Sequence, residues 1–198
     1  RVFTYREPGE PVVLQGQGGA VSTLAFSPDK RTLAVGYDDG RVCLWDIASA
    51  SVEWEEHSSR APARMVAFTP SGRLLSIPRG PVVEIWNLDR RRRVARLLGH
   101  DGAVLTLVYG LDGRLLLTAS NDGTARLWDV AQQRALRVLD DHPGPVTAAT
   151  LDPEARLLLT TSGPYLSIWR VSDAELTARL AFCGTESLVT PGEGGHGV

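Results

Sequence analysis

Four histidines are the side chains of this sequence best suited to bind a metal ion or to move protons near neutral pH. They are His57, His100, His142 and His196. The first three fall in loops that lead into successive apolar segments of the chain. A metal site would require these side chains to converge, and loops that lead into separate sheets do not bring them together. We therefore predict no metal site and no other cofactor.

Motifs of known catalytic chemistry are nearly absent. The sequence contains no Cys-x-x-Cys, no His-Glu-x-x-His, no Gly-x-Ser-x-Gly and no phosphate loop that ends in Gly-Lys-Ser/Thr. The glycines Gly192, Gly194 and Gly197 match the spacing of a dinucleotide fingerprint. They do not follow a strand of a βαβ unit, so we predict no dinucleotide site and no catalytic residue there.

Two charged stretches could contact a partner. Arg90–Arg93 is the only run of like charge, and it could bind a phosphate or an acidic peptide, although a solvated turn is our preferred interpretation. Trp54 stands among Glu53, Glu55 and Glu56, where it could anchor a partner. We favour the interpretation that Trp54 packs over the edge of a sheet.

The overall composition is that of an ordinary globular protein of 198 residues with 43% hydrophobic residues. The net charge of −2 gives no electrostatic reason to expect nucleic acid or an anionic membrane as a partner. Cys43 and Cys183 are too few for a disulfide framework, which favours a reducing, cytoplasmic location. Arginine far outnumbers lysine, which suggests a GC-rich bacterial genome. No run of 18 apolar residues is present.

The segment 99–140 shows how these residues would be held. It contains four short apolar runs at 104–109, 114–120, 124–129 and 134–139, separated by turn residues such as Asn121-Asp122-Gly123. Such runs predict four antiparallel strands joined by tight hairpins. Apolar side chains occupy both faces of these strands, so the sheet must be covered on both sides by copies of itself.

A repeat of 41 or 42 residues runs through the chain. Aromatic residues at the third-strand position mark it: Phe3, Trp45, Trp86, Trp128 and Trp169. We predict four complete four-stranded units at 18–56, 57–98, 99–140 and 141–180. Segment 1–17 would supply the last two strands of a preceding unit, and segment 181–198 would supply the first strand of a following unit and a tail.

The dipeptides Gly99-His100, Trp45-Asp46 and Trp128-Asp129 within this repeat make the chain resemble the WD-repeat family of β-propellers. The resemblance covers almost the whole chain and implies an all-β propeller of four-stranded antiparallel blades. Family propellers usually have seven blades. The chain would therefore form an incomplete ring, either part of a larger propeller or a chain that associates with itself through open blade edges.

The resemblance also implies a buried polar network that supports the fold. One blade can carry all of its members: His100, Thr118 or Ser120, Asp122 and Trp128. Other blades keep only parts of it: Asp39 and Trp45, His142 and Trp169, and Trp86. Gln17 and Ser59 stand at two of the histidine positions. We predict a structural role for all of these residues.

By the same resemblance, the chain would be an interaction scaffold that presents loops to other proteins or peptides. The candidate contact residues on the face of the second-to-third-strand turns are Asp38, Arg60, Arg79, Asn121 and Tyr165. One alternative is an enzyme or ligand site at the central channel, but the predicted first strands carry scarcely a titratable group, with Arg64 the exception. Another is a regulatory appendage of a bacterial kinase or signalling ATPase chain.

Overall fold

The computed structural model describes residues 19–57, 61–183 and 186–191, and in these the chain forms four antiparallel sheets. The expected half-blade at 1–17 lies outside the described residues.

Sheet 1 contains β1 (Val21–Phe26), β2 (Thr32–Tyr37), β3 (Val42–Asp46) and β4 (Ser51–Glu56). Sheet 2 contains β5 (Ala67–Phe68), β6 (Leu74–Arg79), β7 (Val82–Asn87) and β8 (Arg92–Leu97). Sheet 3 contains β9 (Val104–Tyr109), β10 (Leu115–Ser120), β11 (Ala125–Asp129) and β12 (Arg134–Leu139). Sheet 4 contains β13 (Ala148–Leu151), β14 (Leu157–Ser162), β15 (Tyr165–Arg170), β16 (Leu176–Cys183) and β17 (Glu186–Pro191).

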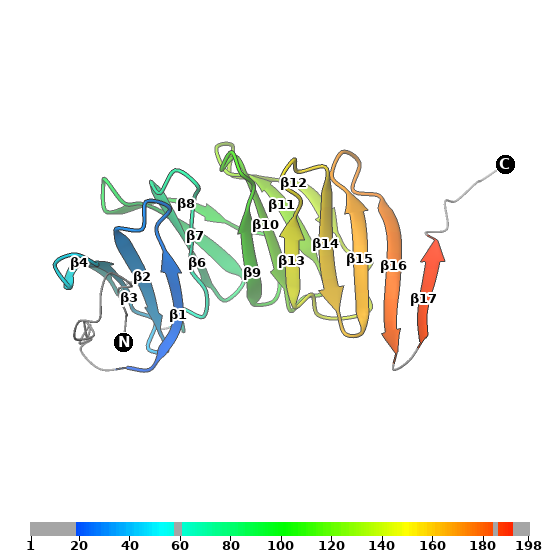
Figure 1. Ribbon diagram of the computed structural model, residues 1–198, viewed down its shortest axis with the longest axis horizontal. Helices are drawn as coiled ribbons and strands as arrows, with labels where there is room; N and C mark the ends of the chain where they lie inside the picture. The colour runs from blue at the N-terminus through cyan, green and yellow to red at the C-terminus, as the bar shows by residue number, and fades with distance from the viewer. Residues whose placement is uncertain (1–18, 58–60, 184–185, 192–198) are drawn as a thin grey trace, which may run out of the picture.

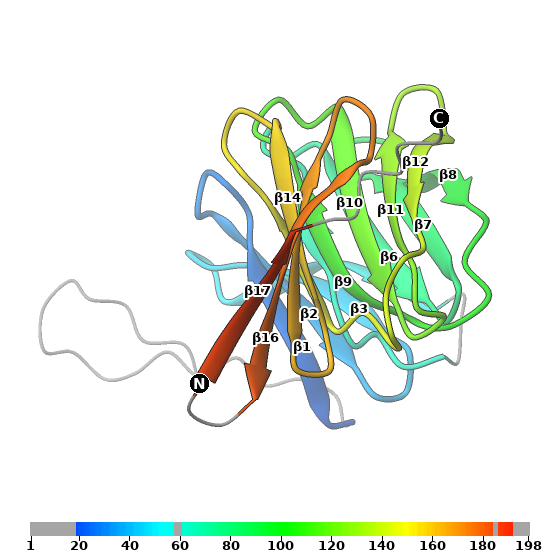
Figure 2. The same ribbon diagram turned by 90° about the vertical axis from the view of Figure 1, so that its right-hand side faces the viewer.

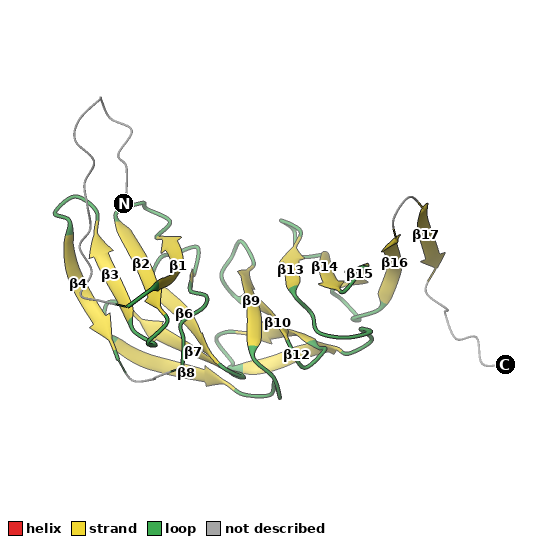
Figure 3. Cartoon of the chain, turned by 90° about the horizontal axis from the view of Figure 1, so that it is seen from below, coloured by secondary structure: helices red, strands yellow, loops and turns green. Residues whose placement is uncertain are grey.

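The four sheets stand side by side in the order of the sequence (Figure 1). Viewed from below, they follow an open arc, with β4 near one end and β17 at the other (Figure 3). The view along the row shows successive sheets stacked behind one another with a progressive twist (Figure 2). This arrangement is the incomplete propeller ring that the repeat predicts. No helix in the described part of the chain has the length and apolar character needed to cross a membrane.

Three of the four hydrophobic clusters in the described residues lie between neighbouring sheets, and the fourth lies on sheet 1 alone. Leu44 of sheet 1 packs in one cluster with Leu75 and Ile77 of sheet 2. Two further clusters join sheet 2 to sheet 3 and sheet 3 to sheet 4, and they contain Trp128 and Trp169 respectively. Each sheet therefore buries apolar side chains on its faces against a neighbour, as the two-sided apolar pattern of the strands predicts.

Two kinds of turn join the second and third strands. In sheets 1 and 3 the turn has three residues and ends in Gly40 or Gly123, whose φ angles of 92° and 85° favour glycine. In sheets 2 and 4 the turn has two residues, Gly80-Pro81 and Gly163-Pro164. The shorter turn removes one residue, which explains why the tryptophan spacing alternates between 41 and 42.

Two strands differ from the sequence expectation. The sequence pattern predicts a first strand over Ala63–Phe68 in the unit 57–98, but β5 pairs with β6 only at Ala67 and Phe68. The neighbouring Pro78 has no N–H to donate to a longer β5, which accounts for the short strand. At the other end, β17 does not begin a new sheet. It pairs with β16 from Ala178↔Pro191 to Cys183↔Glu186 and becomes the fifth strand of sheet 4.

Candidate functional site

A buried polar network joins two strands and two loops of sheet 3. His100 lies before β9, and its Nδ1 is 2.8 Å from Asp122 Oδ2 in the turn between β10 and β11. Its Nε2 is 2.7 Å from Thr118 Oγ1 on β10. Thr118 Oγ1 also accepts the indole N–H of Trp128 at 2.8 Å. The resemblance left Thr118 and Ser120 as alternatives, and the structure shows that Thr118 is the central member.

Ser120 lies beside this network and makes its own hydrogen bonds. Its hydroxyl donates to the carbonyl of Gly102 at 3.0 Å and accepts the backbone N–H of Asp122 at 3.2 Å. Thr124 donates its hydroxyl and its N–H to Asp122 Oδ1. These bonds fix the turn between β10 and β11 to the loop before β9.

The protonation state of the network follows from its partners. Burial lowers the pKa of His100, while the Asp122 carboxylate opposes this shift. Burial also disfavours an ionised Asp122, but hydrogen bonds from Thr124, His100 and the N–H of Asp101 outweigh it and hold the Asp122 pKa well below its usual range. A neutral His100 that donates from Nδ1 to Asp122 and accepts the Thr118 hydroxyl at Nε2 satisfies every member. The network thus supports the fold.

Sheet 4 contains the same network without its carboxylate. His142 Nε2 and Trp169 Nε1 both lie 2.8 Å from Thr160 Oγ1. The Gly163-Pro164 turn has no residue at the Asp122 position, and His142 Nδ1 has no hydrogen-bond partner among the described residues. Burial again lowers the pKa of His142. Sequence reasoning missed Thr160, although the shared segments Leu115–Thr118 and Leu157–Thr160 both read LLLT.

Sheets 1 and 2 lack the network because aliphatic residues replace the central threonine. Val35 and Ile77 occupy the Thr118 position, two residues after the leucine paired with the tryptophan. Trp45 is buried in the apolar cluster of sheet 1. Trp86 instead donates to Glu84 at 3.3 Å, and exposed Asp39 pairs with Arg41 at 2.8 Å. The expected histidine-position residues Gln17 and Ser59 lie outside the described residues.

Arg79 is buried, so its expected display on the turn is wrong. Its side chain is 5% exposed, and Nη2 lies 2.6 Å from Glu56 Oε2 at the end of β4. Nη1 donates to the carbonyls of Gly40 and Ala61 at 2.6 and 3.0 Å. The side chain therefore points back between sheets 1 and 2 and ties them together. The sequence offers no signal for this pairing, because Glu56 precedes Arg79 by 23 residues and belongs to another sheet.

A second polar contact joins sheets 2 and 3. The hydroxyl groups of Ser76 on β6 and Tyr109 on β9 are 2.5 Å apart. Burial raises the pKa of Tyr109 to about 12. The phenol is therefore neutral at physiological pH and serves as an uncharged link between the sheets.

Of the remaining candidate contact residues, Asp38 and Asn121 lie on turns between second and third strands and Tyr165 directly follows such a turn. We call this end of the sheets the turn face. Asp38 and Asn121 are exposed and Tyr165 is half-buried, whereas Arg60 lies outside the described residues. Next to Asn121, a hollow of about 470 Å³ opens between the turn 121–124 and the loop before β13. Its lining residues are Asn121, Asp122, Gly123, Thr124, Asp140, His142, Pro143, Gly144 and Pro145.

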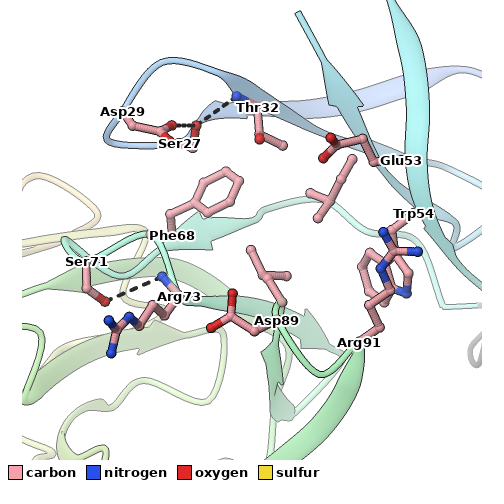
Figure 4. A pocket seen from close by; sticks show the side chains of 13 residues that line it. Ser27, Asp29, Thr32, Glu53, Trp54, Phe68, Ser71, Arg73, Asp89 and Arg91 are labelled. Carbon is pink, nitrogen blue, oxygen red and sulfur yellow. Dashed lines mark hydrogen bonds between the residues drawn. The ribbon is translucent and has the colours of Figure 1, made fainter.

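A second hollow, of about 330 Å³, lies between sheets 1 and 2 at the opposite end of the strands (Figure 4). Phe68 projects into it, and Trp54 closes its outer side. Trp54 also packs on Trp86 across the two sheets, with ring centroids 5.4 Å apart. The preferred interpretation of Trp54 as a packing residue is thus consistent with its position, but the side chain also lines a cavity.

The described residues contain no group of three or more histidine, cysteine or acidic side chains that could hold a metal ion. His57 is exposed and contacts Glu55 at 3.0 Å, while His196 lies outside the described residues. The Arg90–Arg93 run occupies the turn into β8, where Arg93 pairs with Glu84. The geometry offers hollows and exposed turns for binding.

Comparison with known proteins gives matches along much of the chain. A family model for the Vps8 beta-propeller matches residues 10–77, and the model for the WD domain, G-beta repeat, matches residues 91–129. The chain is 33% identical over 105 residues to transducin beta-like protein 3 of Bos taurus. This alignment covers 52% of this chain and 13% of that protein. It is also 33% identical over 92 residues to a guanine nucleotide-binding protein subunit beta of Schizosaccharomyces pombe, with 46% and 30% coverage.

A cyanobacterial relative and a solved structure add to these matches. An uncharacterized WD repeat-containing protein of Synechocystis sp. is 28% identical over 114 residues, covering 57% of this chain and 33% of that protein. A chain in a crystal structure of the mitotic checkpoint complex superposes with a TM-score of 0.80 at 20% identity, covering 88% of this chain and 55% of that chain. This structural likeness shows the fold alone. The chain spans a third or less of the length of these three relatives.

Proposed function

This chain belongs to the WD-repeat β-propellers, and from that premise we propose that it is a protein-interaction scaffold that docks partner proteins or peptides on its turn face. One observation carries the proposal. Asn121 is exposed on its turn, and hydrogen bonds hold the residues on both sides of it in place. Ser120 bonds to Gly102, and Asp122 bonds to His100. A contact residue held rigid before binding loses little conformational entropy when a partner docks.

The docking surface in this proposal consists of Asp38, Asn121 and Tyr165 with the hollow beside Asn121. Arg79 is not part of it, because the side chain is buried. Exposed loops on a rigid scaffold are the usual place for binding residues. The net charge of −2 supports protein rather than nucleic acid or membrane as the partner, and a cytoplasmic location and a bacterial origin belong to the same proposal.

The test is affinity purification with three proteins: the unchanged chain, a variant with Asp38→Arg and Asn121→Arg, and a control with Arg114→Glu. Arg114 is exposed at the opposite end of the strands, so the control alters charge away from the turn face. We expect a set of proteins that the unchanged chain and the control retain and the double variant loses. Retention of the same proteins by all three would contradict docking on the turn face.

We propose no catalytic role. The first strands β1, β5, β9 and β13 contain no acidic, basic or histidine side chain, and catalysis needs several such groups to converge. Because the chain spans a third or less of its named relatives, the activity and partners of any whole protein are also matters of proposal.

A further inference from the structure

The hollow between sheets 1 and 2 has an apolar base and a charged rim. Leu44, Leu88 and Phe68 line it with the ring of Trp54. Figure 4 shows Phe68 directed toward its centre and Trp54 at its outer side. A cavity of about 330 Å³ is of the size that small ligands or a single large side chain occupy. It lies at the end of the strands away from the turn face.

The sequence explains why a hollow forms between these two sheets. Trp54 faces Leu44 across the strand pair β3–β4, and Ala95 holds the corresponding position facing Ile85 in sheet 2. Ala95 is 8% exposed within the core between sheets 2 and 3. The much larger Trp54 reaches across to Trp86 instead. It lines the hollow together with Gly72, whose turn lies against Pro28 of sheet 1.

The two walls of the hollow carry different charges. Sheet 1 contributes the carboxylates of Asp29 and Glu53, and sheet 2 contributes Arg73, Arg91 and Asp89. Asp29 accepts hydrogen bonds from Ser27 and from the N–H of Arg31, which lower its pKa and keep it charged. Among the described residues, no salt bridge joins Glu53, Asp89, Arg73 or Arg91 to another side chain. These charges are therefore available to a ligand.

We infer that this hollow is a second docking site, separate from the turn face, for a short segment of a partner protein. An aliphatic or aromatic side chain of that segment enters between Phe68 and Trp54. An acidic residue beside it pairs with Arg73 or Arg91, and a basic residue pairs with Glu53 or Asp29. Apolar burial supplies affinity, and the divided charge of the rim sets the direction of the bound segment.

The test is selection from a phage-displayed library of random peptides on the purified chain, followed by titration of the selected peptides. We expect peptides that combine one large apolar residue with an acidic and a basic neighbour. Arg73→Glu should weaken their binding by about tenfold, and replacement of the acidic peptide residue by lysine should restore binding to this variant. The matched control is Arg114→Glu, because Arg114 holds the same turn position in sheet 3.

Three outcomes would overturn the inference. Selected peptides could bind Arg73→Glu and Glu53→Lys as well as they bind the unchanged chain, or selection could yield no enriched sequence. A solution mass that doubles with concentration and returns to that of a monomer in Arg73→Glu would assign the hollow to a second copy of the chain. The variant with Asp38→Arg and Asn121→Arg does not alter this hollow. Failure of the turn-face proposal can therefore be distinguished from failure of the proposal for the hollow.

Discussion

Thr118 is the single residue on which the buried network of sheet 3 depends. Its hydroxyl oxygen accepts a hydrogen bond from the indole N–H of Trp128, and the hydroxyl also hydrogen-bonds to Nε2 of His100. Thr118→Val keeps the volume but leaves an indole N–H and an imidazole nitrogen without partners. Since each unsatisfied buried group costs about 1 to 3 kcal/mol, we expect the free energy of unfolding to fall by about 2 to 4 kcal/mol in urea denaturation.

The same substitution at an exposed threonine serves as the control. The hydroxyl of exposed Thr147 contacts only Thr161 among the described residues, so Thr147→Val should change the unfolding free energy by less than about 0.5 kcal/mol. Equal losses for the two variants would mean that the hydroxyl of Thr118 contributes no more than a surface group.

Buried His100 and half-buried His142 make stability depend on pH. Burial lowers the pKa of both His100 and His142 from 6.5 in the unfolded chain, so below that value the unfolded state binds more protons than the folded state. Stability should therefore be complete above about pH 7 and should fall as the pH drops toward 5. The measurement is the urea midpoint at several pH values. His142→Gln should make the decline shallower, and an unchanged midpoint across this range would contradict the role of burial.

The family resemblance predicted three members of the network in sheet 3, because dipeptides and a turn residue mark them in the sequence, but it left Thr118 and Ser120 as alternatives. His100 follows a glycine, Asp122 precedes a glycine in the turn, and Trp128 precedes an aspartate. The burial of Arg79 could not be predicted. Its partner Glu56 lies in another sheet, and only the distance between folded sheets brings the two together. Sequence patterns report local spacing well and contacts between sheets poorly.

At the level of elements, the ion pair between β4 and β6 fastens sheet 1 to sheet 2. Glu56 is 3% and Arg79 5% exposed, so the ion pair is almost entirely shielded from water. Glu56→Leu alone should destabilise the chain by about 3 to 5 kcal/mol, because it removes the Glu56 carboxylate that pairs with a buried guanidinium. The double variant Glu56→Leu with Arg79→Met should recover most of this loss. Urea unfolding of Glu56→Leu, Arg79→Met and the double variant completes the double-mutant cycle, and strictly additive losses would contradict the coupling.

The turns between second and third strands explain why the networks differ between sheets 3 and 4. The three-residue turn of sheet 3 supplies Asp122, whereas Gly163-Pro164 is one residue shorter and supplies no carboxylate. This difference was visible in the sequence as the alternating tryptophan spacing. Only the strand register shows that the shorter spacing arises from a turn with one residue fewer.

Replacing Gly163-Pro164 with Asn-Asp-Gly should complete the second network. The new carboxylate would accept the N–H of His142 Nδ1, which has no partner among the described residues. We expect a gain of about 1.5 to 3 kcal/mol in unfolding free energy, since a hydrogen bond to a charged group contributes that much. A graft of Asn-Ala-Gly is the control for the turn itself. If both grafts have the same stability, the carboxylate does not reach His142.

At the level of the whole molecule, the open arc leaves apolar side chains in water at its ends. Leu24 and Phe26 on β1 are 60% and 58% exposed, and Phe182 on β16 is 62% exposed. In the interior of the row, the corresponding faces are buried against the next sheet, as the clusters around Trp128 and Trp169 show. The two-sided apolar pattern of each strand predicted this need for a neighbour, but not which side chains would stay exposed.

Such exposed apolar faces should drive association between copies of the chain. We expect the mass measured by light scattering to rise with protein concentration, and a variant with Leu24→Ser and Phe26→Ser to remain closer to the monomer. Leu111→Ser is the control, because Leu111 is 73% exposed on an isolated turn between β9 and β10. Equal effects of the two variants would show that association does not use the end of the row. A monomeric mass at all concentrations would show that the exposed apolar faces of the open arc are tolerated in water. It would exclude self-association as the means by which these faces are buried.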